Sequence, residues 1–237
     1  YLKGKSSKEI LISTYVCHPS MANNEISGPV ISTFIAKYCK SIERKYSMRF
    51  IYVPETIGAI AYINKNFKNL KKNVIASYCL TCIGDERNYS LITSKYGDSL
   101  SDLTAQEALK KLKIKYKKYT FLDRGSDERQ FNSFGVEIPM TVLSRTKFGN
   151  YPEYHTSLDD FKVVTEKGLK GGYRVVKKII NLLQNKIIPL SNIVCEPMLN
   201  KRKLYPMNFN PKKKISQDII NILSFMSYSD GKNDLEK

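Results

Sequence analysis

The chain has 237 residues, of which 42% are hydrophobic and 26% charged, so it is long and apolar enough to bury a core in one large domain with a small appendage. No run of about 18 apolar residues occurs, so we expect neither a transmembrane helix nor a membrane as partner. The net charge of +17 is spread along the chain, which indicates a lysine-rich surface rather than a dedicated nucleic-acid groove.

The five cysteines are odd in number and show no spacing typical of a disulfide framework. We therefore expect free thiols in a reducing cytoplasm. No signal peptide is visible, and the sequence begins with Tyr rather than Met. We expect a cytoplasmic fragment whose N-terminal part is missing.

Apolar β-branched runs alternate with helical patterns over most of the chain. Strands are predicted at residues 10–16, 48–53, 74–83, 89–93, 116–121 and 138–143. Helices are predicted at 30–38, 56–67, 100–112, around 131–134 and at 165–183, with Thr56 and Thr165 placed to cap two of them. This alternation is typical of an α/β sheet with helices on both faces.

The sequence changes character after residue 185. Residues 187–211 are rich in proline and predict a linker or edge extension, and residues 216–226 predict an amphipathic helix. We interpret this end as the beginning of a second small domain.

Polar residues follow the predicted strands at their carboxyl ends, where open α/β sheets bind ligands. They are His18, Glu55, Asp85, Asp127 and His155. Histidine with carboxylates is the composition of a metal site, most simply zinc, and a glutamate beside it could act as general base. The alternative is structural: strand-end acids commonly cap turns and helices, and a lone histidine is often a core residue.

Five segments together resemble the di-zinc aminopeptidase family of bacterial leucyl aminopeptidases and glutamate carboxypeptidase II. They are His18 with Asn24-Glu25-Ile26-Ser27-Gly28, Glu55-Thr56-Ile57-Gly58, Gly84-Asp85, Gly125-Ser126-Asp127, and Tyr154-His155-Thr156-Ser157-Leu158-Asp159. The segments CHPS, PETIG and EYHTSLDDF resemble a subgroup of bacterial aminopeptidase-like proteins with an inserted domain and a C-terminal winged helix-turn-helix.

This resemblance implies a fold and a domain division. The fold is a zinc-exopeptidase-like three-layer α/β sandwich with a mixed, mostly parallel sheet whose N-terminal part is missing. Residues 1–204 would form the aminopeptidase-like domain, and residues 205–237 the beginning of the winged helix.

The resemblance also implies roles for individual residues. His18 resembles a ligand of one zinc, Asp85 and His155 resemble ligands of the other, and Glu55 resembles the general base. Arg124, Asp127, Arg145 and Tyr151, which lie in loops after the site strands, are candidates for binding substrate.

Two positions depart from the family pattern. Asn24 occupies the position of the aspartate that bridges the two metals, and Thr56 occupies that of a glutamate ligand. An amide offers one neutral oxygen where a carboxylate offers two oxygens and a charge, so Asn24 should bridge poorly. Glu25 or Asp127 could substitute, and the chain could hold one zinc, two or none.

Two functions follow from these residues. The first is a metal-dependent aminopeptidase-like hydrolase of peptides or small amides that uses metal-activated water. The second is a catalytically impaired relative that acts as a binding or regulatory protein and engages nucleic acid through its winged helix. The sequence carries no signal of oligomeric state.

Overall fold

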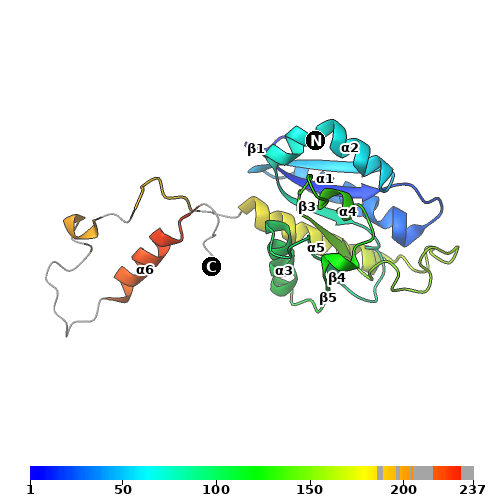
Figure 1. Cartoon of the computed structure of the whole chain (residues 1–237). Helices are drawn as coiled ribbons and strands as arrows, with labels where there is room; N and C mark the ends of the chain where they lie inside the picture. Colours follow the sequence, from blue (N-terminus) through cyan, green and yellow to red (C-terminus); the bar gives the residue numbers. More distant parts are fainter. Residues whose placement is uncertain (186–188, 196–197, 203, 205–215, 231–237) are drawn as a thin grey trace. The chain divides into compact units, whose positions relative to one another are not determined.

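The computed structural model describes residues 1–185, 189–195, 198–202, 204 and 216–230. The chain divides into two compact units, Tyr1–Gln184 and Asn185–Lys237. The first unit carries the sheet and every candidate site residue (Figure 1).

The first unit is built on one six-stranded sheet in the order β2-β1-β3-β6-β4-β5. All neighbouring strands run parallel except β4 and β6, which pair antiparallel. The expected mixed, mostly parallel sheet is therefore confirmed. The strands are β1 (Ser6–Tyr15), β2 (Tyr46–Val53), β3 (Val74–Leu80), β4 (Ser90–Ile92), β5 (Lys117–Tyr119) and β6 (Met140–Ser144).

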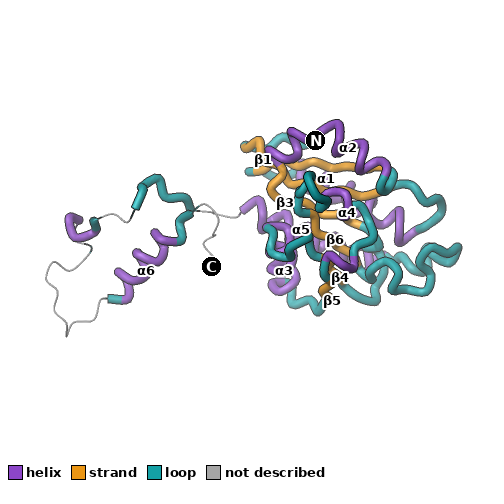
Figure 2. Tube along the Cα trace, viewed as in Figure 1, coloured by secondary structure: helices purple, strands orange, loops and turns teal. Residues whose placement is uncertain are grey.

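Helices cover both faces of this sheet and form three layers with it (Figures 1 and 2). One hydrophobic core joins the sheet to α1 (Ser27–Lys40), α3 (Leu100–Lys111) and α5 (Glu166–Asn185). A second core on the opposite face joins it to α2 (Ile57–Asn73) and α4 (Glu128–Phe131).

The apolar run in the middle of β1, Ile10 to Ile12, is explained by the position of this strand inside the sheet. Ile10 and Ile12 belong to the core beneath α1 and α5, whereas Leu11 belongs to the core beneath α2. Successive strand side chains point to opposite faces, so a strand covered on both faces must be apolar at consecutive positions.

Helix α5 shows the pattern expected of a helix with one buried face. Val176, Ile179, Ile180 and Leu183 are at most 1% exposed and recur at helical spacing. Thr165 precedes the helix, and its Oγ1 accepts a hydrogen bond of 3.0 Å from the Gly168 N–H, in agreement with the predicted cap.

The structure adds a helix at residues 22–26, between the predicted strand at 10–16 and the predicted helix at 30–38. They form a short π-helix, η1 (Ala22–Ile26), directly before α1. Thr56 does not cap α2 with its side chain; instead it has a φ of +62°. Strand β3 ends earlier than predicted, and the chain turns at Cys82, where φ is +47°.

The second unit contains η3 (Leu199–Arg202) and α6 (Gln217–Ser227), and Leu190 pairs with Asp230 in an antiparallel bridge. The predicted helix at 216–226 is confirmed. The winged helix stays a prediction, and much of the predicted linker at 187–211 lies outside the described residues. A bilayer-spanning helix is absent from the residues that the structure describes.

Candidate metal centre

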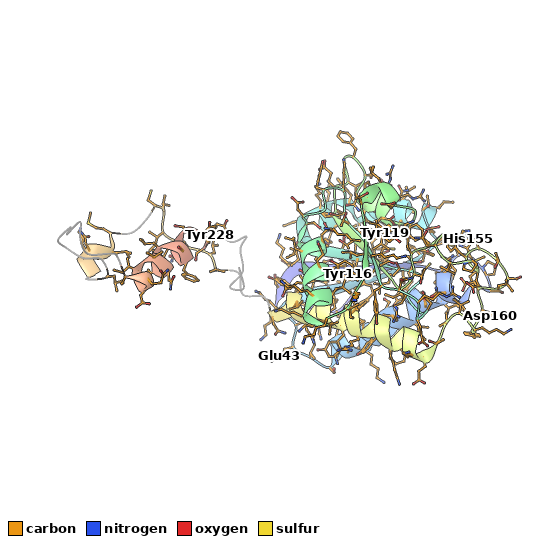
Figure 3. All side chains as sticks on the ribbon, turned by 90° about the horizontal axis from the view of Figure 1, so that it is seen from below. Glu43, Tyr116, Tyr119, His155, Asp160 and Tyr228 are labelled. Carbon is orange, nitrogen blue, oxygen red and sulfur yellow. The ribbon has the colours of Figure 1, made fainter. Side chains whose placement is uncertain are left out.

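The carboxyl ends of four neighbouring parallel strands meet at one edge of the sheet. The loops after β1, β2, β3 and β6 carry His18, Glu55, Asp85 and His155, respectively. Figure 3 shows His155 at one end of the first unit and Glu43, which precedes β2, at the opposite end.

The loop after β1 gathers a thiol, an imidazole and a carboxylate. The Nδ1 atom of His18 lies 2.7 Å from Oε1 of Glu25 and 3.4 Å from Sγ of Cys17. The same sulfur lies 3.6 Å from Oε1 of Glu25. Among the described residues, these three side chains form a group whose ligand atoms all lie within 4.8 Å of one another.

The π-helix η1 places Glu25 in this cluster. The Cys17 N–H donates to Oε2 of Glu25 at 2.8 Å, so both carboxylate oxygens are engaged at the end of β1. The carboxylate of Asp159 accepts from the N–H groups of Asn23 and Asn24 at 2.7 and 3.0 Å and thereby anchors η1. Because η1 is anchored, the backbone that carries the Glu25 side chain is held in place.

The two histidines lie against each other. Their ring centroids are 4.8 Å apart, and the ring of His155 stacks on Tyr154 at 4.0 Å. His155 has a φ of +56°, an uncommon conformation for a residue other than glycine. The loop after β6 is therefore held in a conformation that brings His155 onto the β1 cluster.

Glu55 is half-buried beside this cluster. Burial raises the pKa of its carboxyl group, and the Glu25 carboxylate adds to this, whereas a hydrogen bond from Ser126 and the charges of Arg129 and His18 oppose it. Its backbone N–H lies 3.5 Å from Sγ of Cys17.

Residues after β5 hold the Glu55–Thr56 segment. The Thr56 N–H donates to Oδ1 of Asp127 at 2.8 Å, and Arg129 Nη2 donates to the Thr56 hydroxyl at 2.9 Å. Asp127 is fully buried, and its Oδ2 has no hydrogen-bond partner. Burial raises the pKa of Asp127 to about 7, and the Glu55 and Glu128 carboxylates contribute. These contacts hold Thr56, a β-branched residue, at its unfavourable positive φ.

The side-chain oxygen of Asn24 lies in a buried hydrogen-bond network, whereas its Nδ2 donates to Oε1 of Glu25 at 3.4 Å. Asn24 Oδ1 accepts from the Tyr15 hydroxyl at 3.0 Å, and Thr81 Oγ1 donates to the Asn24 backbone oxygen at 3.2 Å. The Cys82 thiol lies 3.6 Å from the same Oδ1 and 3.5 Å from the Tyr151 hydroxyl. Tyr151, predicted to bind substrate, is therefore part of this network.

Asp85 is engaged by the protein on both carboxylate oxygens. Oδ1 accepts from the Thr146 hydroxyl at 2.7 Å and from the Arg87 N–H at 2.9 Å. Oδ2 accepts from the Thr146 N–H at 2.9 Å and from Asn23 Nδ2 at 3.3 Å. Asp85 is 1% exposed, and these contacts are those of a carboxylate that joins β3 to the loop after β6.

The two arginines predicted to bind substrate make other contacts. Arg145 is buried, donates to the Asn88 carbonyl at 2.7 Å and lies over the Tyr89 ring. Arg124 is exposed and lies over the Phe121 ring. Their role in substrate binding stays a prediction.

The donor set present at β1 suits zinc. Thiolate, imidazole and carboxylate are all ligands that this ion accepts. The group opens into a cavity of about 340 Å³ lined by residues 16–19 and by Glu25, Ile26 and Pro29. Cys17 was missed as a candidate ligand, although its position next to His18 was the available signal.

Comparisons with known proteins agree with this architecture. A profile of the family described as "Domain of unknown function (DUF4910)" matches residues 1–186. A protein of Clostridium acetobutylicum, whose name gives polysaccharide biosynthesis and an aminopeptidase-like domain, is 36% identical over 99% of this chain and 54% of its own length. The chain thus spans about half the length of the curated relative it matches.

Solved structures show the same fold. A crystal structure of a protein from Clostridium acetobutylicum is 35% identical with a TM-score of 0.79 over 99% of this chain and 52% of that chain. A zinc aminopeptidase of Bacillus subtilis is 20% identical with a TM-score of 0.63 over 80% of this chain and 49% of that one. An aminopeptidase of Aneurinibacillus is 18% identical with a TM-score of 0.65 over 83% and 48%. The chain belongs to the DUF4910 family and is an aminopeptidase-like protein.

Proposed function

We propose that this chain is a metal-dependent hydrolase of amide bonds in small peptides or peptide-like substrates, with Glu55 as its general base. The observation that carries the proposal is the position of Glu55: a half-buried carboxyl group beside the His18 cluster, with a pKa raised by burial. The names of the aminopeptidase relatives support the reaction class.

His18 is the residue most directly placed to hold the metal, and the ring of His155 lies against it. A zinc ion bound there would polarise the substrate carbonyl and lower the pKa of a bound water. Glu55 would accept the proton of the attacking water and deliver it to the leaving amine. A raised pKa of Glu55 favours delivery of the proton to the leaving amine, because the protonated carboxyl group must be accessible near neutral pH.

The side chains around Glu55 fix its orientation. Ser126 hydrogen-bonds to the carboxyl group, and Asp127 and Arg129 hold the next residue, Thr56. Val16, Ile26 and Pro29 give the neighbouring cavity an apolar rim, which fits an uncharged side chain of a substrate.

The test is release of the N-terminal residue from short peptides and aminoacyl anilides, with and without added zinc. Glu55→Gln should lower kcat about 100-fold or more, since general bases typically contribute that much. The matched control is Glu43→Gln at the opposite end of the unit (Figure 3), which should leave kcat unchanged. Full activity of Glu55→Gln would contradict the role of Glu55.

A second candidate is a binding protein without catalysis, and Asn24 and Thr56 favour it. Both replace carboxylates of the resembled family, and both are engaged by the protein, Asn24 by Tyr15 and Thr56 by Arg129. Failure of the metal-loaded chain to cleave any peptide or amide tested would support this candidate. Nucleic-acid binding would then be measured by the loss of affinity with added salt.

A further inference from the structure

We infer that this chain binds a single metal ion through Cys17 Sγ, His18 Nδ1 and the Glu25 carboxylate, in place of the carboxylate-bridged pair that the resemblance implies. The inference concerns the same site as the proposed function and specifies its ligands. It holds whether or not amide hydrolysis occurs.

The spacing of the three donors fits one tetrahedral ion. Zinc with nitrogen and oxygen ligands at about 2.0 Å and sulfur at about 2.3 Å separates its ligand atoms by about 3.3 to 3.7 Å. The two separations that involve Sγ are 3.4 and 3.6 Å. The Nδ1–Oε1 separation is 2.7 Å, that of a direct hydrogen bond, and needs to widen by about half an ångström when a metal replaces the shared proton.

The carboxylate at this site comes from the position after the one expected. The side chain of Asn24 is directed to the Tyr15 hydroxyl, whereas Glu25 Oε1 lies against His18. The extra residue per turn in the π-helix η1 accounts for this change of direction, and such π-bulges are frequent at functional sites. Asn24 Nδ2 donates to Glu25 Oε1 at 3.4 Å and so helps to hold the carboxylate in place.

Among the described residues, no second group of three close ligand side chains accompanies the first. Asp85 accepts four hydrogen bonds from the protein, and Asn24 Oδ1 accepts one from Tyr15. Both lie in the buried interior, where removing these partners leaves unsatisfied donors at a cost of about 1–3 kcal/mol each. The site is therefore mononuclear.

The cluster leaves room for a further ligand. Cys17 is exposed, and the cavity of about 340 Å³ opens directly onto the three donors. An open coordination position next to three protein ligands is typical of catalytic rather than structural zinc sites. The Glu55 N–H lies 3.5 Å from Sγ of Cys17, so the proposed general base is next to the cluster in the fold.

The experiment uses Co²⁺ as a spectroscopic probe. The chain is stripped with a chelator and titrated with Co²⁺ and then with Zn²⁺, and the metal bound per chain is measured by elemental analysis. We expect one ion per chain and a thiolate-to-cobalt charge-transfer band. In Cys17→Ser the band should disappear and the affinity should fall at least about tenfold, since loss of an outer-shell partner alone costs that much.

The matched control is Cys195→Ser, which removes the other exposed thiol and should keep both the band and the affinity. Persistence of the band in Cys17→Ser, two ions per chain, or no binding at all would overturn the inference. Metal-dependent hydrolysis without a thiolate band would contradict the ligand set and leave the proposed function standing. A thiolate band without any hydrolysis would support the ligand set and contradict the proposed function.

Discussion

The ends of β1 and β3 carry similar polar signals in sequence and differ in what their side chains contact. At the end of β1, Glu25 faces His18 and Cys17 and borders an open cavity. At the end of β3, Asp85 is 1% exposed and accepts four hydrogen bonds from Thr146, Arg87 and Asn23. The difference lies in the partners: Asp85 is held by amide, hydroxyl and backbone donors and joins loops together, whereas Glu25 faces an imidazole and a thiol, which are metal ligands themselves.

The largest effect is expected from Asp85→Ala, which tests whether Asp85 stabilises the fold. The change removes the acceptor of the Thr146 and Arg87 N–H groups and the Thr146 hydroxyl. Unsatisfied buried donors cost about 1–3 kcal/mol each, so the free energy of unfolding should fall by roughly 3 kcal/mol or more. Urea denaturation measures it. A loss below about 1 kcal/mol would show that Asp85 is not a structural carboxylate.

Gly168→Ala tests the same region from the side of α5. A Cβ atom there would meet the backbone oxygens of Gly84 and Asp85, so the helix could no longer approach the end of β3. Overpacking of this kind lowers the free energy of unfolding by about 1–3 kcal/mol, which thermal unfolding should show as a lower Tm. A Tm of Gly168→Ala equal to that of wild type would contradict the close packing.

The pH dependence of stability tests the buried carboxyl group behind Glu55. Burial raises the folded pKa of Asp127 to about 7, above its ordinary value of 3.8, so the folded state binds the proton more tightly than the unfolded state. This contribution is fully present below the unfolded pKa and is lost as pH rises toward 7. The free energy of unfolding, measured with urea at pH 5 and pH 8, should fall between these values by about 1–3 kcal/mol less in Asp127→Asn than in wild type. This variant keeps an acceptor for the Thr56 N–H. An unchanged slope would exclude the raised pKa.

The smallest effect is expected at the ion pair of Arg87 and Glu153, which joins the loop after β3 to the loop that carries His155. Arg87 donates two hydrogen bonds of 2.7 Å to Glu153 and lowers the pKa of that carboxyl to about 2. The pair is exposed, so Glu153→Gln should cost less than about 1 kcal/mol at neutral pH, and less still in high salt. The depressed pKa means that wild type loses this contribution as pH falls from about 4 toward 2, and the variant should not. A larger, salt-independent loss would show that the pair does more than link two surface loops.

The sequence predicted the sheet because its signals are local. Apolar residues at consecutive positions in β1 and helical spacing in α5 follow from burial on two faces and on one. The partners of Asn23, Asn24 and Glu25 could not be predicted in this way. They are polar residues that read as a loop, yet all three are buried, because Asp159, more than 130 residues away, anchors the first two.

The same limit applies to the candidate ligands. His18, Glu55 and His155 were placed at one edge of the sheet by the rule that parallel strands share their carboxyl ends, and the structure brings His155 onto His18. The contrast between Glu25 and Asp85 depends instead on Thr146 and on the π-helix η1, and neither leaves a mark in the local pattern.

Zinc content per chain in Glu25→Gln and Asp85→Asn, measured side by side with wild type, tests the central claim most directly. We predict one zinc in wild type, little or none in folded Glu25→Gln, and one zinc in Asp85→Asn with a lowered Tm. Retention of zinc by Glu25→Gln together with its loss from folded Asp85→Asn would contradict the account and return the metal to the end of β3.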